Sequence, residues 1–503
     1  MQKKQTILVV ASLLVVVLSV TLAYFTAQII GKGKIVTINS ADLKIIFTDS
    51  DGSISGTNIE PGKWNVTKTF TIENKSNETY KYNIVIQDLV NTFVTNGYLQ
   101  YKITSTNGGY NMTEFKDVPK SETATDTILA YSVSISVGVT QSYTVEFKYA
   151  NDESVDQSND MGKKLSGTLF ITEGTEDPNK TLYNQLLVDK STKLTRTDFS
   201  KVLTDNNTKT LYTSTEDSKT VYYFAGNATD NWVKFGKNAS NQDLYWRIIR
   251  TNSDGGVRLL YHGTSTTATD AYIGTSAFNT TYNNSMYVGY MYGTSGAQAS
   301  NRTNENSSTI KTAIDNWYVS NLEAKGYTKY LSTTAVYCND REVGSGTYSA
   351  TGSTFYYAAY ARLNTNKTPT YDCTNINDKF TVDTSTGNGK LTYPIALMTA
   401  DEISYAGGLY GTNAPTWYYY NSANGSSTGS TWWWLLSPDG WGGSDANVFG
   451  VNGSSNPGYL DSSNVLNTSG VRPAISLKSC IKYSTGNGSA SDPYTIKETT
   501  SGC

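Results

Sequence analysis

The chain has one histidine, His262, and only four cysteines, none of them in a CxxC pair. Zinc sites draw their ligands from several Cys and His side chains, so a zinc site of the usual kind is excluded. A Ser-His-Asp triad would need His262, and no GxSxG motif precedes it in the sequence. No pair of carboxylates stands out for glycoside hydrolysis. The sequence therefore predicts a protein that is not an enzyme, and His262 is interpreted as a loop or core residue.

Charged residues are also scarce, at 17% of the chain, and the formal net charge is -3. The protein therefore has no excess of positive charge that would attract the phosphates of a nucleic acid. Nucleic acid is therefore excluded as a partner. Ser, Thr, Asn and Gly are abundant instead, together with 38 tyrosines and 9 tryptophans. Such rings give rigid contact area for sugars or proteins, although all-β folds are also rich in tyrosine for structural reasons. The composition favours a protein that works by binding.

The N-terminus resembles an export signal. Lys3 and Lys4 precede the uncharged apolar run 6–30, which is long enough to cross a bilayer core of about 30 Å. The run is either a signal peptide, cleaved after Ala23, or a signal anchor that holds the protein in the membrane. Both alternatives predict an extracytoplasmic protein at the cell surface, membrane-anchored or secreted.

The residues around and after this run carry a family resemblance. Ala23 stands before an aromatic pair, and the segments 38–45, 60–63 and 70–76 follow as a first strand, a PG turn and a strand with a polar end. Over about the first 100 residues the chain resembles the TasA and camelysin family of matrix-fibre proteins, which are processed by a signal peptidase of the SipW type. The resemblance implies a structural role in an extracellular matrix.

The length of 503 residues predicts two or three domains after the export segment 1–33. Residues 34–175 contain short alternating runs such as 82–86 and 143–147, which predict an all-β, antiparallel sandwich of immunoglobulin-like type. Residues 176–218 are expected to form a partly helical linker, which either packs on the next domain or serves as a spacer. Residues 219–503 then form an α+β domain.

Several local signals support the α+β assignment. Residues 244–250 and 257–261 flank Asp254-Gly255, which predicts a β-hairpin. Ser308 is expected to cap a helix that runs to about residue 324. Thr399 and Glu402 form a capping box for a second, short helix.

Ordered sequence blocks in this domain resemble a known fold. NWVKFG, WRIIR, DNWY, YCNDR, TADEI, WWWLLSP and GVRP follow one another over about residues 222–496. In this order they resemble the C-type lectin-like fold, in the branch shared by formylglycine-generating enzymes, diversity-generating variable proteins and an uncharacterised domain of Firmicutes surface proteins. That fold hosts enzymes, sugar binders and protein binders, so the resemblance implies a fold rather than a ligand.

The four cysteines do not support the enzyme branch. An exported cysteine pair is more often a structural disulfide than a reactive pair. Sequence proximity favours Cys338–Cys373 and Cys480–Cys503, although four cysteines allow three pairings. The EPN and QPD triplets of calcium-dependent lectins are missing, so no cofactor is expected from a known motif. Asp439, Asp445, Asn447 and Asp461 carry oxygens that would suit calcium, which leaves a calcium site open, although such residues in Gly-rich loops are more often turn formers.

The loops of the C-terminal segment, after about residue 417, supply the predicted binding surface. Rings that are expected to be exposed, among them Tyr418 and Trp441, border stretches rich in Gly, Ser and Asn there, a composition typical of adaptable binding loops. The predicted ligand-binding residues are Tyr418, Tyr420, Asp439, Trp441 and Asn447. The sequence thus indicates a bacterial cell-surface adhesin or ligand-binding protein that displays a lectin-like domain to a host or bacterial surface protein or a glycan. The alternative is a fibre-forming matrix component of TasA-like type; an exported enzyme is a third, less favoured class, because no set of catalytic residues supports it.

Overall fold

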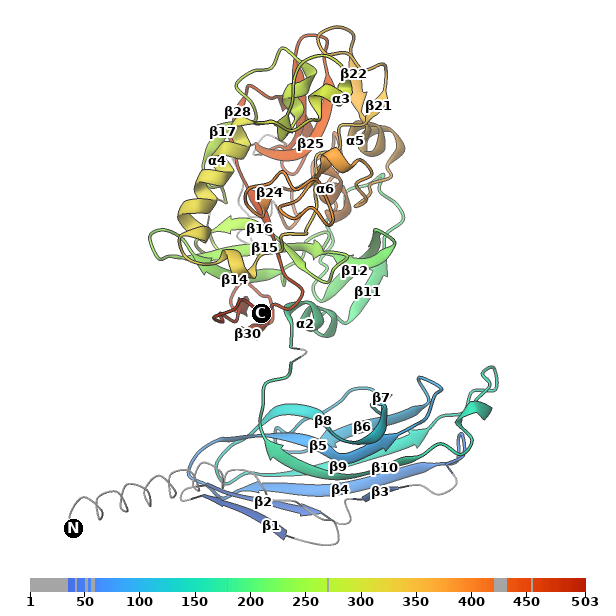
Figure 1. Ribbon diagram of the computed structural model, residues 1–503. Helices are drawn as coiled ribbons and strands as arrows, with labels where there is room; N and C mark the ends of the chain where they lie inside the picture. The colour runs from blue at the N-terminus through green and yellow to red at the C-terminus, as the bar shows by residue number, and fades with distance from the viewer. Residues whose placement is uncertain are drawn as a thin grey trace, which may run out of the picture. The chain divides into compact units, whose positions relative to one another are not determined.

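The computed structural model describes residues 35–40, 43–49, 53–55, 59–178, 180–268, 271–419, 432–453 and 456–503 (Figure 1). These residues form a mostly β-sheet protein. The export segment and its cleavage position Ala23 lie outside them, as does Tyr420. In the part of the chain that is described, no helix has the length and apolarity to span a bilayer. The chain divides into two compact units, Met1–Pro178 and Asn179–Cys503.

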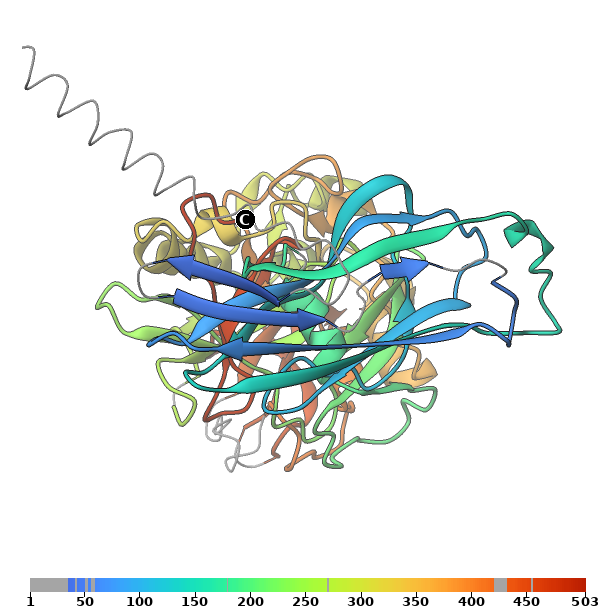
Figure 2. The same ribbon diagram turned by 90° about the horizontal axis from the view of Figure 1, so that it is seen from below.

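The first unit consists of two antiparallel sheets, and its blue N-terminal strands run side by side in Figure 2. One sheet has the order β1 (Ile35–Ser40), β2 (Leu43–Asp49), β4 (Asn65–Asn74), β9 (Thr140–Tyr149), β6 (Leu99–Ser105), β7 (Lys116–Asp117). The other has the order β3 (Ser53–Ser55), β10 (Leu165–Glu173), β5 (Tyr80–Asn91), β8 (Ser121–Ile135), and a 3-10 turn, η1 (Ser158–Asp160), precedes β10.

Alternating apolar side chains from both sheets form one core. Tyr143, Val145 and Phe147 of β9 are buried together with Ile84 and Ile86 of β5. This alternation places every second side chain on the inner face, because successive strand residues point to opposite faces of a sheet. The predicted strands at 82–86 and 143–147 are confirmed.

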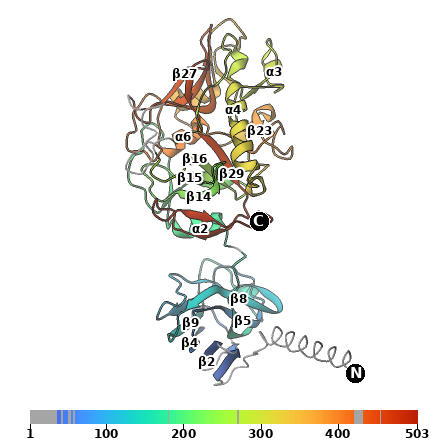
Figure 3. The same cartoon turned by 90° about the vertical axis from the view of Figure 1, so that its left-hand side faces the viewer.

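The second unit is built on two larger sheets. The first has ten strands. Seven of them follow the order β11 (Thr192–Thr195), β12 (Thr210–Glu216), β13 (Lys219–Tyr223), β15 (Asp243–Thr251), β14 (Trp232–Lys237), β31 (Tyr494–Ile496), β30 (Tyr483–Thr485). The other three branch from β15, which also pairs with β16 (Val257–Gly263); β16 pairs with β29 (Pro473–Leu477), and β29 with β24 (Ile395–Leu397). Figure 3 shows β15, β16 and β29 as neighbouring strands. The predicted hairpin is therefore confirmed as β15 and β16.

The second sheet of this unit carries the candidate site. Its order is β17 (Thr275–Ala277), β28 (Thr468–Gly470), β25 (Trp433–Trp441), β22 (Phe355–Tyr357), β21 (Val343–Ser345), and β25 also pairs with β26 (Ala446–Val451), which pairs with β27 (Leu460–Asn464). Two short ribbons complete the strands: β18 (Met291–Tyr292) with β19 (Asn306–Ser307), and β20 (Tyr337–Cys338) with β23 (Lys379–Phe380).

Helices in the second unit are short insertions between strands. They are α2 (Leu182–Asp189), η2 (Ser285–Val288), α3 (Gln298–Asn301), α4 (Thr309–Tyr318), η3 (Val319–Glu323), η4 (Thr328–Tyr330), α5 (Ala358–Tyr360), η5 (Ala361–Asn366), η6 (Ile376–Asp378) and α6 (Ala400–Ala406). Both predicted caps are confirmed. The Ser308 side chain accepts a hydrogen bond from the Lys311 backbone N–H, and Thr399 and Glu402 form a reciprocal capping box at α6.

The interval 176–218 contains a helix, and most of it packs into the second unit. It contributes α2, β11 and β12 to the second unit, and the side chains of Leu182, Leu186 and Leu211 are buried in that unit's core. These apolar side chains are removed from water by packing there, which stabilises the segment as part of a folded unit rather than as a spacer.

The two cysteine pairings expected from sequence proximity are confirmed. Cys338 is bonded to Cys373 and Cys480 to Cys503, with Cα–Cα distances of 5.7 and 5.4 Å. Disulfides persist in oxidising compartments, so the two bonds indicate an extracytoplasmic environment.

Candidate ligand-binding cleft

A cavity of about 260 Å³ opens in the second unit, where β22, β25, β26 and β27 lie next to one another. Strand pairing brings its lining together from segments far apart in the sequence: Tyr356 pairs with Gly440, and Gly440 with Asn447. The lining residues are Thr354, Tyr356, Tyr360, Tyr410, Asp439, Gly440, Trp441, Gly442, Asn447 and Ser462.

Three tyrosine rings form one wall of the cavity. Tyr356 and Tyr360 are stacked, with ring centroids 4.0 Å apart and planes at 17°. Tyr410 stands nearly perpendicular to Tyr360, at 80° and 5.7 Å. A side chain on Gly440 would place its Cβ only 2.9 Å from the Tyr356 ring, so glycine at this position lets the ring lie against β25. The result is a corner built of two perpendicular aromatic surfaces.

An irregularity in the strand pairing of β25 turns the Asp439 side chain toward the cavity. Pro438 pairs with Val448 and Gly440 with Asn447, so Asp439 is the extra residue of a β-bulge. Bulges leave one residue outside the regular pairing and redirect its side chain, and they occur often beside functional sites.

The Asp439 carboxyl is buried without a counterion. The residue is 5% exposed, and its Oδ1 has no hydrogen-bond partner among the described residues. Burial raises its pKa to about 7; a hydrogen bond from Ser462 opposes this rise, and the neighbouring carboxylate of Asp461 adds to it. No lysine or arginine is present in the described lining of the cavity.

The remaining polar groups of the cleft are held by local hydrogen bonds. The indole Nε1 of Trp441 donates to the Gly352 carbonyl at 3.2 Å. The Asn447 side chain is partly exposed, and its Nδ2 donates to the Asp445 carboxylate at 3.0 Å. These bonds fix both side chains before any ligand arrives, which reduces the entropy lost on binding.

The structure brings together three of the five predicted site residues, Asp439, Trp441 and Asn447. The expectation that Trp441 is an exposed ring is wrong, because it is 1% exposed and packs as part of the cavity floor. Tyr418 does not belong to the cleft. It is 0% exposed and packs against the Tyr419 ring and the buried Arg247 guanidinium, with distances of 3.8 and 5.3 Å.

Sequence reasoning missed the tyrosines that form the aromatic wall. Tyr356 belongs to β22 and Tyr360 to the short helix α5, so the stacking of their rings depends on the change from strand to helix between them, which residue spacing does not indicate. Tyr410 enters through an isolated bridge to Leu460, a contact that no local pattern indicates.

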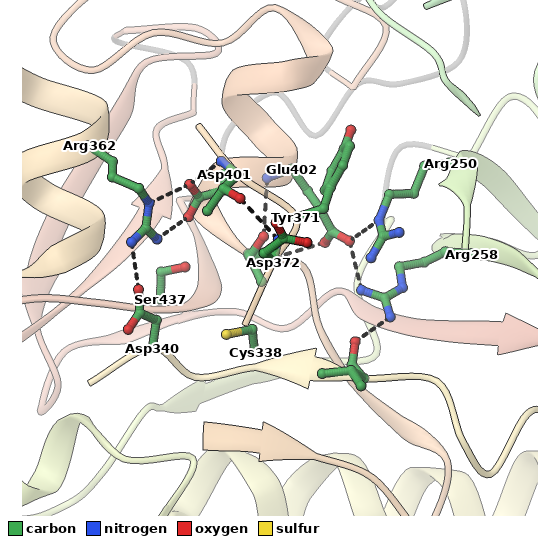
Figure 4. Close-up of a pocket in the computed structure, with 13 residues that line it drawn as sticks. Arg250, Arg258, Cys338, Asp340, Arg362, Tyr371, Asp372, Asp401, Glu402 and Ser437 are labelled. Carbon is green, nitrogen blue, oxygen red and sulfur yellow. Dashed lines mark hydrogen bonds and ion pairs between the residues drawn. The ribbon is translucent and has the colours of Figure 1, made fainter. Parts of the chain in front are cut away.

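A second, polar pocket in the same unit is filled by ion pairs (Figure 4). Glu402 contacts Arg250 at 2.9 Å and Arg258 at 2.7 Å. Arg362 bridges Asp340 and Asp401 at 2.6 and 2.9 Å.

This ion-pair pocket is interpreted as structural. Burial alone would raise the pKa of Glu402, but Arg258 and Arg250 hold it below its ordinary value. The free space is only about 20 Å³, roughly room for one water. Its charges already have partners, so a ligand would gain little there.

Metal binding has no support in the described part of the chain. No group of three or more His, Cys, Asp or Glu side chains is placed to hold an ion. Calcium takes six to eight oxygen ligands, usually with several carboxylates among them. Comparison with known proteins adds nothing: no family model, curated protein or solved structure matches the chain.

Proposed function

We propose that this protein is a bacterial cell-surface ligand-binding protein or adhesin, which captures its ligand in the tyrosine-walled cleft of its second unit. The second unit is proposed to be a C-type lectin-like domain, and the first an immunoglobulin-like sandwich that presents it. The proposal is supported by the two disulfides, which fit an extracytoplasmic location, and by the preformed cleft.

The single observation that carries the proposal is the Asp439 carboxyl. Burying an unpaired charged group costs several kcal/mol, and folded proteins keep such groups mainly where they have a function. Asp439 lines a cavity that combines a wall of tyrosine rings with a few fixed polar groups, and such aromatic and polar groups together orient ligands in binding pockets.

The test is capture of glycans and surface proteins from an array by the full chain in a non-ionic detergent. We expect Tyr360→Ala to lower capture at least tenfold, because the ring lies between Tyr356 and Tyr410 and its loss opens the wall. The melting temperature should change little, since Tyr360 is partly exposed.

The matched control is Tyr282→Ala, which removes an exposed ring of the same unit that does not line the cleft. Equal capture by the wild type and the Tyr360→Ala variant would contradict the proposal, as would equal losses in both variants.

A further inference from the structure

Buried carboxylates in the second unit follow one pattern with a single exception among the described residues. Five of the six have an arginine or lysine nitrogen within 2.9 Å: Glu216, Asp230, Asp378, Asp401 and Glu402. Asp439 is the sixth and has no such partner. A buried carboxylate is stable as an anion when a cation or several hydrogen-bond donors accompany it, and Asp439 has no cation and an Oδ1 without a donor, so a positive charge supplied by a ligand would stabilise its anion.

The aromatic wall favours a cation for an independent reason. Tyrosine faces attract positive charge through the ring quadrupole, most strongly where water is displaced. The rings of Tyr360 and Tyr410 stand at 80° to each other, so both can contact one compact group in the corner between them. Burial and then the electrostatic effects of Asp439 and neighbouring groups raise the pKa of the Tyr410 hydroxyl, so this ring stays neutral.

We propose that the cleft binds an organic ammonium group, which pairs with the Asp439 carboxylate and packs against the rings of Tyr360 and Tyr410. This inference rests on the proposed function, because it names the ligand class of the same site. The cavity of about 260 Å³ lies just below the range of about 300–1,000 Å³ typical of drug-sized ligands. It therefore suits a small alkylammonium or quaternary ammonium headgroup.

Two other ligand classes fit the cleft less well. Calcium would need several more oxygen ligands than the tyrosine corner and Asp439 provide. A neutral sugar could stack on the rings and donate a hydroxyl to Asp439, but it would leave the carboxylate charge buried and uncompensated.

Binding should depend on pH in a defined direction. The groups that face the Asp439 carboxyl are the hydroxyls of Ser462, Tyr360 and Tyr410 and the carboxylate of Asp461. The Asp439 pKa of about 7 means that the anion predominates at pH 8 and the neutral acid at pH 5.5. If only the anion holds the ammonium, affinity falls roughly 30-fold between these two pH values.

The experiment is isothermal titration of the full chain, in a non-ionic detergent, with choline and with 3,3-dimethyl-1-butanol, which has the same shape without the charge. We expect saturable binding of choline at pH 8, about 30-fold weaker binding at pH 5.5, and at least tenfold weaker binding of the neutral alcohol. Asp439→Asn should weaken choline binding at least tenfold and remove its pH dependence. Asp492→Asn is the matched control, because Asp492 is exposed in the same unit and does not line the cavity, and this variant should bind choline like the wild type.

Equal affinity for choline and the alcohol would overturn the inference, as would unchanged choline binding by Asp439→Asn. Calcium chloride and N-acetylglucosamine are titrated in parallel, and tighter binding of either than of choline would also overturn it. Vesicles of phosphatidylcholine distinguish a lipid headgroup from free choline as the source. If choline fails to bind while Tyr360→Ala still abolishes capture on the array, the ammonium inference falls and the proposed function stands.

Discussion

Replacement of Glu402 by alanine is expected to lower the free energy of unfolding by about 3–5 kcal/mol, the cost of removing one partner from a buried ion pair. Glu402 Oε1 contacts both Arg250 and Arg258, and all three side chains are almost fully buried. Glu402 Oε2 also accepts a hydrogen bond from the Thr399 backbone N–H at the start of α6. The substitution therefore leaves two buried cations without this shared partner and weakens a helix cap.

Urea unfolding of the full chain, followed by tryptophan fluorescence, measures this change. Glu402→Gln keeps an acceptor for the cap but removes the charge, so most of the loss should remain in that variant. Glu305→Ala, at an exposed position of the same unit, should stay within about 0.5 kcal/mol of the wild type. A loss below 1 kcal/mol in Glu402→Ala would show that the ion-pair pocket is not structural.

Replacement of Asp439 by asparagine is expected to stabilise the protein above neutral pH. The folded protein raises the pKa of this carboxyl from 3.8 to about 7, mainly through burial. The native state therefore holds the proton more tightly than the unfolded chain does. The contribution of this group to stability is most favourable below pH 4 and is lost as the pH rises to 7.

Asparagine carries no charge at any pH and is nearly isosteric with the protonated acid. At 1.36 kcal/mol per pKa unit, the variant gains at most about 4 kcal/mol at pH 8 and less than about 1 kcal/mol at pH 4. Unfolding of wild type and variant at both pH values measures the difference. A variant less stable than the wild type at pH 8 would mean that the carboxylate is paired in the folded protein. We expect Asp439→Asn to gain stability and to lose choline binding, which is the combination that a residue retained for its function shows when it is replaced.

Local signals in the sequence predicted much of the fold. The hairpin at Asp254-Gly255, the caps at Ser308 and Thr399, and the cysteine pairs all depend on short spacings, and the structure confirms each of them. The sequence also placed Asp439 and Asn447 in one site, because a Gly-rich turn between two strands brings its flanks together.

The rest of the site depends on contacts between residues that are far apart in the sequence, which local patterns do not indicate. Tyr418 looked exposed because a polar, Gly-rich stretch follows it, yet the guanidinium of Arg247, from a distant strand, is buried and lies over its ring. The tyrosine wall draws on β22, α5 and the segment after α6, which strand pairing assembles around β25. Composition indicated that rings would form the binding surface, but it could not select which of the 38 tyrosines would do so.

The most direct test of the central claim is the ¹³C NMR titration of the Asp439 carboxyl, in full chain labelled at aspartate, with the Asp439→Asn spectrum to assign the signal. We expect a pKa of about 7 for Asp439 in the free protein, which falls by more than one unit when choline is saturating. A pKa near 4 in the free protein, or a value that choline leaves unchanged, would contradict it.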